Sequence, residues 1–287
     1  MTLGFLAFCI QSATGVACFV HFGKTEKKDD LSMNIHIYGT DARLEFCREY
    51  LLKSKNRSLG NVALLPVPTT KDGKTLHGTK INLDTLSEKL VGCTTCVGYE
   101  IPKDLRGELS EGGVAVIDVS RDEKYLAENA VLTAIGTVGR ILSEERAAPC
   151  DLSFGIIGFG RIGQKLLNVL MYLEGRVVVF TSKNELRSEL CMLGVSGGDS
   201  LALDSADAAS KISGLDILIN TAPARLINES LKDRLANVRI IELASGDNFP
   251  EGLAVERFVS VPAAMYPKSA GFALARSVLR MLGEAEK

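Results

Sequence analysis

The sequence has little net charge, which excludes some classes of partner. Its 287 residues include 33 lysines and arginines and 35 aspartates and glutamates, so the net charge at pH 7 is only −2. Without an excess of positive charge there is no electrostatic basis for binding nucleic acid. With 46% hydrophobic and 24% charged residues, the composition is typical of a soluble globular protein, and the length suits two domains of ordinary size.

The cysteine pattern excludes a disulfide framework. Seven cysteines, an odd number, are scattered along the chain, which favours a reducing compartment and predicts a cytoplasmic protein. Cys93 and Cys96 form a single CxxC in an apolar stretch that is typical of a strand, where positions three apart point to opposite faces. They are therefore expected to be core thiols rather than a redox pair. No second cysteine or histidine pair completes a zinc site, and no metal is expected.

Histidines are few, and none stands in an obvious catalytic motif. His21 lies near the N-terminus, His36 lies inside a predicted strand, and only His77 lies in a loop. We expect His36 to be half-buried and hydrogen-bonded, and His77 to be solvated.

The first 32 residues differ from the rest of the chain. Residues 3–22 carry no positive charge and are just long enough to span a bilayer. Polar residues interrupt this run, and the basic region that opens a signal peptide is missing. Met33 stands directly before the first predicted strand, so residues 1–32 are expected to be an upstream extension that is not translated. A membrane anchor is the alternative.

Strands alternate with helices along the remaining chain, which predicts parallel sheets. We expect an α/β protein with two Rossmann-like domains and a cleft between them. Residues 33–147 would form a flavodoxin-like or Rossmann-like substrate domain, residues 148–264 a dinucleotide-binding domain, and residues 265–287 a C-terminal helix that returns to the first domain. Predicted strands cover residues 35–38, 62–67, 94–99, 113–118, 153–157, 176–180, 215–219, 238–243 and 257–261. Predicted helices cover residues 44–53, 83–90, 125–143, 161–173, 184–192, 205–212, 227–234 and 269–282.

The most informative motif is a glycine-rich turn between a predicted strand and a helix. Gly158, Gly160 and Gly163 have the GxGxxG spacing, and Arg161 and Ile162 lie between the last two glycines. In a dinucleotide site the first glycine allows the sharp turn, the second lets the backbone approach the pyrophosphate, and the third lets helix and strand pack closely. The diphosphate would accept hydrogen bonds from the helix N-terminus. A purely structural glycine turn is the alternative.

The end of the next predicted strand indicates which dinucleotide binds. An NAD enzyme usually has an acid there to bind the ribose 2′-hydroxyl. This sequence has Thr181, Ser182 and Lys183 instead, and Arg187 follows one turn later. Two hydroxyls and two cations suit a 2′-phosphate, so NADP is expected. Binding of NAD is an alternative, because Glu185 is close by. A second alternative is a solvated polar loop that has no preference between the two cofactors.

A further polar strand end follows in the second half. Ligands of open parallel sheets bind at the carboxyl edge of the strands. Asn220 and Thr221 lie at that edge and are expected to contact the cofactor ribose, while Pro223 stiffens the loop. A polar strand end without a ligand is the alternative.

Several motifs, in the same order, resemble one family. They are residues 38–43, residues 64–67 with the threonine-rich loop that follows, the glycine turn at 158–163, and residues 220–223, 226–228, 242–245 and 267–271. From residue 33 to the C-terminus the chain is similar to the family of the dipicolinate synthase A subunit, which is found in spore-forming bacteria.

The resemblance implies a sporulation-associated two-domain dehydrogenase that acts with a smaller, flavoprotein-like B subunit in a homo- or hetero-oligomer. It implies oxidation of a dihydro- or hydroxytetrahydro-dipicolinate to pyridine-2,6-dicarboxylate (dipicolinate), with the reducing equivalents passing to a nicotinamide cofactor. Two alternatives stay open. The first is a divergent dehydrogenase acting on another small carboxylate, and the second is a non-catalytic dinucleotide-binding paralogue.

A dicarboxylate substrate needs cations and hydrogen-bond donors. Arg43 follows the first strand and is expected to reach the cleft, where Asp41 would orient it or relay a proton. Thr69 and Thr70 are expected to donate to a carboxylate. A surface arginine and solvated hydroxyls are the alternatives.

Lys268 and Ser269 begin the last predicted helix. A lysine near the cleft can bind a carboxylate, or donate a proton if burial lowers its pKa, and Ser269 is expected to bind substrate beside it. A solvated helix start is the alternative. The chain also departs from the family at two places expected to touch the cleft. Ile135 replaces a glutamate, and Val261-Pro262-Ala263 replaces a Leu-Pro-Gly loop.

Overall fold

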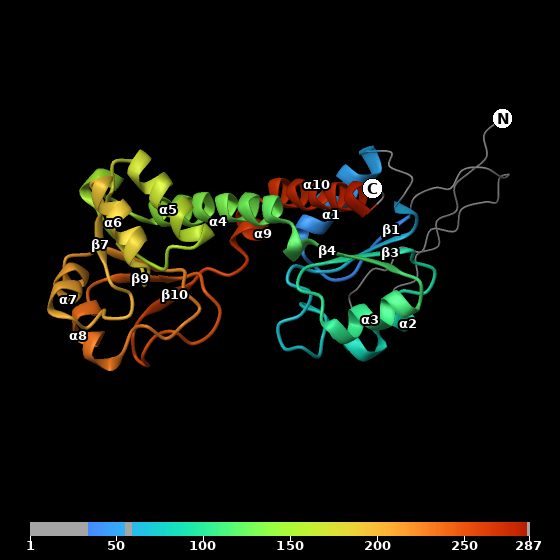
Figure 1. The fold of residues 1–287 in the computed structure, drawn as a ribbon, viewed down its shortest axis with the longest axis horizontal. Coiled ribbons are helices and arrows are strands. Elements are labelled where there is room, and N and C mark those ends of the chain that lie inside the picture. Colours follow the sequence, from blue (N-terminus) through green and yellow to red (C-terminus); the bar gives the residue numbers. More distant parts are fainter. Residues whose placement is uncertain (1–33, 55–58, 286–287) are drawn as a thin grey trace, which may run out of the picture. The chain divides into compact units, whose positions relative to one another are not determined.

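Two parallel sheets with helices packed on them make up the part of the chain that the computed structural model describes, residues 34–54 and 59–285 (Figure 1). The predicted α/β fold with two Rossmann-like sheets is confirmed. The expectations for residues 1–32 fall outside the described residues.

The first sheet has four strands in sequence order, each parallel to its neighbours. Its middle strands are buried along their whole length, as parallel strands covered on both faces are. The strands are β1 (Ile35–Ile37), β2 (Val62–Leu64), β3 (Thr95–Gly98) and β4 (Ala115–Asp118). The helices between them are α1 (Ala42–Ser54), α2 (Leu86–Lys89) and α3 (Lys103–Glu111).

The second sheet has the strand order of a dinucleotide-binding Rossmann sheet, β10-β9-β8-β5-β6-β7, with all pairs parallel. Its strands are β5 (Ser153–Ile157), β6 (Arg176–Phe180), β7 (Ser196–Gly198), β8 (Ile217–Asn220), β9 (Arg239–Glu242) and β10 (Val255–Arg257). Its helices are α5 (Arg161–Tyr172), α6 (Asn184–Met192), α7 (Ala206–Ser213) and α8 (Lys232–Leu235). The order reverses between β5 and β8, and ligands of such sheets bind outside the carboxyl ends of the strands at this point.

Three further helices complete the described elements: α4 (Glu123–Glu144), α9 (Val261–Met265) and α10 (Pro267–Ala285). Short 3₁₀ helices are η2 (Leu83–Thr85), η3 (Val119–Arg121), η4 (Pro149–Asp151) and η5 (Glu229–Leu231). Figure 1 shows α10 beside α1, and apolar side chains of both helices share one core cluster with the first sheet. The end of the chain therefore completes the core around its first strand.

One predicted strand is wrong, and α3, α9 and β7 were not predicted. The strand expected at 257–261 is β10 at Val255–Arg257, where it pairs with β9, and Pro262 lies in the first turn of α9. Proline suits the first helical turn because its missing N–H has no helical partner there. Helix α3 buries only Leu105 and Leu109, and β7 contains two glycines, so both gave weak hydrophobic patterns.

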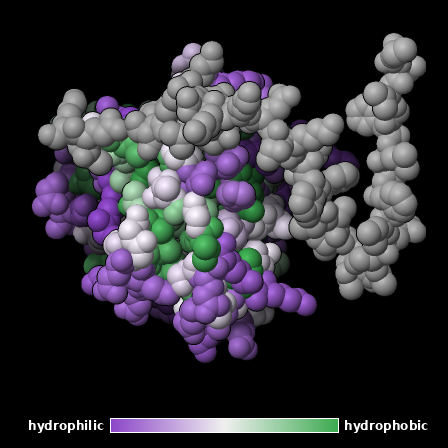
Figure 2. Space-filling view, turned by 90° about the vertical axis from the view of Figure 1, so that its right-hand side faces the viewer, coloured by the Kyte–Doolittle hydropathy of each residue, from purple (hydrophilic) through white to green (hydrophobic). Residues whose placement is uncertain are grey.

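Figure 2 shows one face of the molecule, on which hydrophobic residues gather in the middle, with hydrophilic residues beside and below them. Leu52 of α1 and Val91 after α2 are among the exposed large hydrophobic residues of the chain, with 47% and 84% of their surface accessible. Across residues 34–54 and 59–285, every helix is too short or too polar to cross a membrane.

Candidate functional site

The glycine turn after β5 has the geometry that a dinucleotide requires. Gly158 has φ +89°, a left-handed conformation that favours glycine. A Cβ at Gly163 would overlap the carbonyl oxygen of Gly158, so helix α5 touches the turn. At Gly160, by contrast, a Cβ would meet no atom within 4 Å. Space is therefore open in front of the backbone at the position where a pyrophosphate would approach.

The N-terminus of α5 faces this space without a side-chain cap. Gly160 is its N-cap residue and makes no side-chain hydrogen bond. The N–H groups of a first helical turn have no partner within the helix and attract anions. Arg161 follows, and its guanidinium binds both carboxylate oxygens of Glu123 at 2.7 and 2.8 Å. This pair links α5 to the start of α4.

The end of β8 is tied to the same turn. Thr221 donates its hydroxyl to the carbonyl oxygens of Ile157 and Gly158, at 3.0 and 3.2 Å. Asn220 is 2% exposed, and its side chain is used by internal bonds to Ala222 and Glu242. Both side chains therefore hold the strand ends around the glycine turn, and their expected contact with a cofactor ribose stays a prediction. Pro223 lies exposed in the loop that follows.

Glu242, at the end of β9, is the centre of this internal network. Its carboxylate accepts bonds from Asn220 at 3.0 Å, from Asn248 at 3.1 Å and from the N–H of Ala244 at 2.9 Å. Burial raises the pKa of Glu242, and this effect is larger than the lowering of the pKa by the three hydrogen-bond donors. The network shapes the loop at 243–248, which lines the larger of the two cavities described below.

The loop after β6 carries the residues expected to choose the dinucleotide. Thr181 is buried, whereas Ser182 and Lys183 are exposed. Arg187 donates to the carbonyl of Thr181 at 2.7 Å and lies 3.4 Å from the carboxylate of Asp199. The exposed hydroxyl and ammonium are thus open to a ligand, while the Arg187 guanidinium is partly neutralised.

Arg43 and Asp41 form a buried ion pair at the start of α1. Their side chains are 3% and 10% exposed, and Nε of Arg43 lies 2.9 Å from the carboxylate. Asp41 precedes the helix and accepts the Arg43 N–H at 3.1 Å, which is the usual role of an N-cap aspartate. It also accepts the N–H of Val67 at 3.3 Å, and Arg43 Nη2 donates to the carbonyl of Val67 at 3.4 Å. These contacts fix the guanidinium between α1 and the loop that follows β2.

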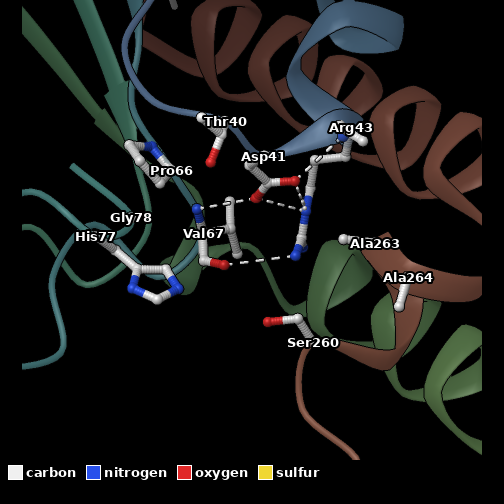
Figure 3. A pocket seen from close by; sticks show the side chains of 11 residues that line it. Thr40, Asp41, Arg43, Pro66, Val67, His77, Gly78, Ser260, Ala263 and Ala264 are labelled. Atoms are coloured by element: carbon white, nitrogen blue, oxygen red, sulfur yellow. Dashed lines mark hydrogen bonds and ion pairs between the residues drawn. The ribbon is translucent and has the colours of Figure 1, made fainter. Parts of the chain in front are cut away.

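A cavity of about 230 Å³ opens at this ion pair (Figure 3). Residues from three segments line it: the turn before α1 with the first residues of that helix, the loop after β2, and α9 with the residue before it. They are Thr40, Asp41, Ala42, Arg43, Pro66, Val67, His77, Gly78, Ser260, Ala263 and Ala264. We refer to this space as cavity 1.

A larger cavity of about 670 Å³, cavity 2, shares Arg43, Val67 and Ser260 with cavity 1. Further lining residues come from the loops after β2 and β3, from β9, β10 and the loops that follow them, and from α4, α5 and α9. They include Thr70, Lys71, Tyr99, Glu100, Asn129, Thr133, Ile162, Glu242, Leu243, Ala244, Ser245, Arg257, Val261 and Pro262. Ile162 brings the first turn of α5 to this space. The side of the molecule that carries Arg43 and the side that carries the glycine turn therefore meet in cavity 2.

Two lining residues of cavity 2 have a strained backbone. Among the described residues that are not glycine, Glu100, Glu174 and Ser260 have positive φ, and the first and last of these line cavity 2. Such conformations cost about 1–3 kcal/mol and gather at functional sites. Their position supports a ligand-binding role for this cavity.

The other predicted substrate residues lie in different surroundings. Thr69 is fully buried, and its hydroxyl accepts the N–H of Tyr99 at 3.0 Å. Thr70 lines cavity 2, where its hydroxyl donates to Asp72 at 3.1 Å. Lys268 and Ser269 are exposed and line neither cavity, and the Lys268 ammonium lies 5.7 Å from the ring centre of Phe272. Arg43 therefore pairs with Asp41 at cavity 1 and shares cavity 2 with Thr70, whereas Lys268 and Ser269 line neither cavity.

Three expectations for single residues do not match the structure. His77 lines cavity 1 and is half-buried rather than solvated, and His36 is exposed rather than half-buried. Ile135, expected at the cleft, is 42% exposed and lines neither cavity. Its neighbour Thr133 lines cavity 2 instead, because positions two apart on a helix point in different directions.

The chain is similar in fold to solved dehydrogenase-like structures. The A subunit of dipicolinate synthase from Bacillus halodurans is 17% identical with a TM-score of 0.68, covering 88% of this chain and 98% of that one. The A chain of dipicolinate synthase from Bacillus subtilis is 18% identical with a TM-score of 0.67, covering 89% and 98%. Salmonella D-lactate dehydrogenase is 15% identical with a TM-score of 0.53, covering 89% and 97%.

At these identities the likeness shows a shared fold. No protein-family model and no curated protein sequence matches the chain. The resemblance to the dipicolinate synthase A subunit that the sequence motifs indicated is thus confirmed in the three-dimensional fold.

Proposed function

We propose that the chain is a nicotinamide-dependent oxidoreductase that oxidises a cyclic dihydro- or hydroxytetrahydro-dipicolinate to dipicolinate, as the names of two proteins with a similar fold suggest. The observation that carries this proposal is cavity 2. It is lined by the buried cation Arg43 and by Ile162 in the first turn of α5, next to the glycine turn, so a carboxylate and a dinucleotide bound at that turn can meet there.

The residues around the turn fit a bound dinucleotide. The open space at Gly160 and the uncapped N-terminus of α5 would accept the diphosphate. When bound, the nicotinamide would accept a hydride from the ring carbon of the dihydropyridine substrate, and one proton would be released. The exposed Ser182 and Lys183 support NADP, although Asp199 beside Arg187 weakens the positive field there.

The task of the protein is then to hold the substrate in the correct orientation. Arg43 would bind a substrate carboxylate, and Asp41 would hold Arg43 in place through the ion pair and the helix cap. Lys268 has no role in this proposal, because it lines neither cavity.

The proposal is tested by the absorbance of reduced nicotinamide, using the full chain with and without a B subunit from the same genome. Enzymatically generated dihydrodipicolinate is offered together with NADP or NAD. We expect NADPH and dipicolinate to appear in equal amounts. Tight NADPH binding without turnover would support a non-catalytic paralogue, and turnover of simple 2-oxo acids would support a different dehydrogenase.

The proposal also includes a cytoplasmic location. It further includes a homo- or hetero-oligomer in which the chain works with a smaller flavoprotein-like subunit. Hydrophobic patches on a protein surface often mark contact surfaces, and Figure 2 shows one such patch. Sedimentation of the chain alone and with the B subunit tests this part. Val91 is a single exposed hydrophobic residue, with 84% of its surface accessible. Association that is lost on Val91→Asp would support a contact at this valine.

A further inference from the structure

His77 lies at cavity 1, although the polar loop around it in the sequence predicts a solvated side chain. Its loop follows β2 and carries several backbone hydrogen bonds that fix the histidine in place. The N–H of His77 donates to the carbonyl of Thr69 at 2.9 Å, and Thr69 is itself bonded to Tyr99 through both its N–H and its hydroxyl. Thr69 is therefore a buried support that holds His77 at cavity 1, across from the start of α1 (Figure 3).

The charges around cavity 1 nearly cancel. Arg43 supplies one positive charge, and Asp41 neutralises it at 2.9 Å. Lys71, from the same loop as His77, is exposed, so water and salt weaken its charge but do not remove its effect on His77. The α9 residues that line the cavity, and Ser260 directly before them, carry no charge.

A carboxylate entering this cavity would therefore find hydrogen-bond donors but little net positive charge. Burying an anion without a compensating charge is costly. His77 is the remaining titratable group among the cavity 1 residues. Burial and the positive charges of Lys71 and Arg43 lower the pKa of His77, while Asp41 raises it. The surroundings of the empty cavity thus favour the neutral ring, and an anion bound beside it would favour the protonated ring.

We propose that cavity 1 is a carboxylate subsite, in which Arg43 and His77 together bind one carboxylate of a small dicarboxylate, and that His77 takes up a proton as this carboxylate binds. The inference rests on the proposed function for the substrate class. The rest of the substrate would lie in cavity 2, which adjoins cavity 1 at Arg43 and Ser260.

Proton uptake makes binding depend on pH in a defined direction. Above the pKa of free His77, each binding event must draw a proton from solution. Affinity should therefore fall by about tenfold per pH unit as the pH rises, until the pKa of the complex is passed. A neutral hydrogen-bonding residue at position 77 would bind the same anion without this slope.

Calorimetric titration of the full chain with pyridine-2,6-dicarboxylate tests the inference, with and without NADP, in two buffers of different ionisation enthalpy at pH 7. We expect wild type to take up about one proton per ligand. His77→Gln and His77→Asn should remove this uptake and flatten the pH dependence. His36→Gln is the matched control, because His36 is exposed on β1 and lines neither cavity, and it should behave as wild type.

Melting temperatures without ligand show whether each variant is folded, and the ring pKa of His77, followed by NMR in wild type, should rise when the dicarboxylate is added. If the ligand binds through Arg43 but no proton is taken up, or if the His77 variants keep the uptake, the inference is overturned and the proposed function survives. If NADP binds and the dicarboxylate does not, both the subsite and the proposed substrate class are overturned.

Discussion

Gly271 of α10 lies directly against Arg43 of α1. A Cβ at position 271 would overlap the carbonyl oxygen of Arg43, and it would stand 2.7 Å from Cβ of Phe46 and 2.9 Å from the N–H nitrogen of Cys47. The two helices approach this closely only because residue 271 has no side chain. The last helix of the chain thus sets the position of the helix that begins with the buried arginine.

Gly271→Ala should therefore destabilise the protein by about 1–3 kcal/mol, because the added methyl group overpacks the contact between α10 and α1. The measurement is the free energy of unfolding in urea. Gly283→Ala in the same helix is the matched control, since a Cβ there meets no atom within 4 Å, and it should be neutral or slightly stabilising. Equal effects of the two substitutions would contradict the close contact.

The glycine turn offers a pair of substitutions that separates binding from folding. Gly160→Ala should leave the melting temperature of the free protein unchanged, because its Cβ has open space, but should weaken NADPH binding by at least about tenfold. Gly163→Ala should lower the melting temperature, because its Cβ overlaps the Gly158 carbonyl. Unchanged NADPH affinity in Gly160→Ala, measured by nicotinamide fluorescence, would place the dinucleotide elsewhere.

Arg43→Gln should weaken dicarboxylate binding by about 10- to 100-fold, since it removes a charge-assisted hydrogen bond. It should also lower stability by about 1–3 kcal/mol, because the buried Asp41 loses its partner. Arg48→Gln is the control, since Arg48 is an exposed residue of the same helix. An unchanged affinity for the dicarboxylate in Arg43→Gln would show that Arg43 does not bind it.

Ile135→Glu should leave turnover unchanged, because Ile135 is exposed and lines neither cavity. Thr133→Val, two residues earlier in α4, should change the KM for substrate, because Thr133 lines cavity 2. Steady-state kinetics of both variants show which of the two positions contacts the substrate. A gain of activity in Ile135→Glu would mean that this face of α4 reaches the substrate.

The thiols should react in an order set by burial. Cys150 and Cys191 are exposed, whereas burial raises the pKa of Cys96 to about 12 and raises that of Cys47 still further. Because the thiolate is the reactive form, iodoacetamide at a mildly alkaline pH should modify the exposed pair first and the buried pair only after unfolding. Peptide mapping by mass spectrometry gives the order, and early modification of Cys96 would contradict its place in the core.

Sequence patterns predicted the sheets and the glycine turn because these depend on short-range signals. A buried strand followed by GxGxxG and a helix determines the local geometry within a few residues. The carboxyl ends of β5 and β8 then meet because the sheet is parallel, and this places Thr221 at Gly158 as a contact across 63 residues.

The substrate side was harder to predict because its residues come from long connections. His77 lies in a loop without hydrophobic periodicity, and its place at cavity 1 depends on the fold of that loop, which a backbone bond to Thr69 helps to fix. Lys268 was misleading for a related reason: its motif adjoins Gly271, which does contact α1, but Lys268 itself extends outward beside Phe272, one turn along the helix. A motif locates a segment, whereas the direction of each side chain depends on the packing of the whole helix.

The packing of α10 on α1 also bears on how the chain is synthesised. Ala273, Leu274 and Val278 belong to the same buried cluster as Leu44 and Leu51 of α1, although the ribosome makes the two groups more than two hundred residues apart. Folding during translation usually proceeds from the N-terminus. All strands of the second sheet are synthesised before α10. The core of the first sheet is completed only when α10 has left the exit tunnel of the ribosome. Until then α10 does not cover the apolar surface of α1 on which it packs.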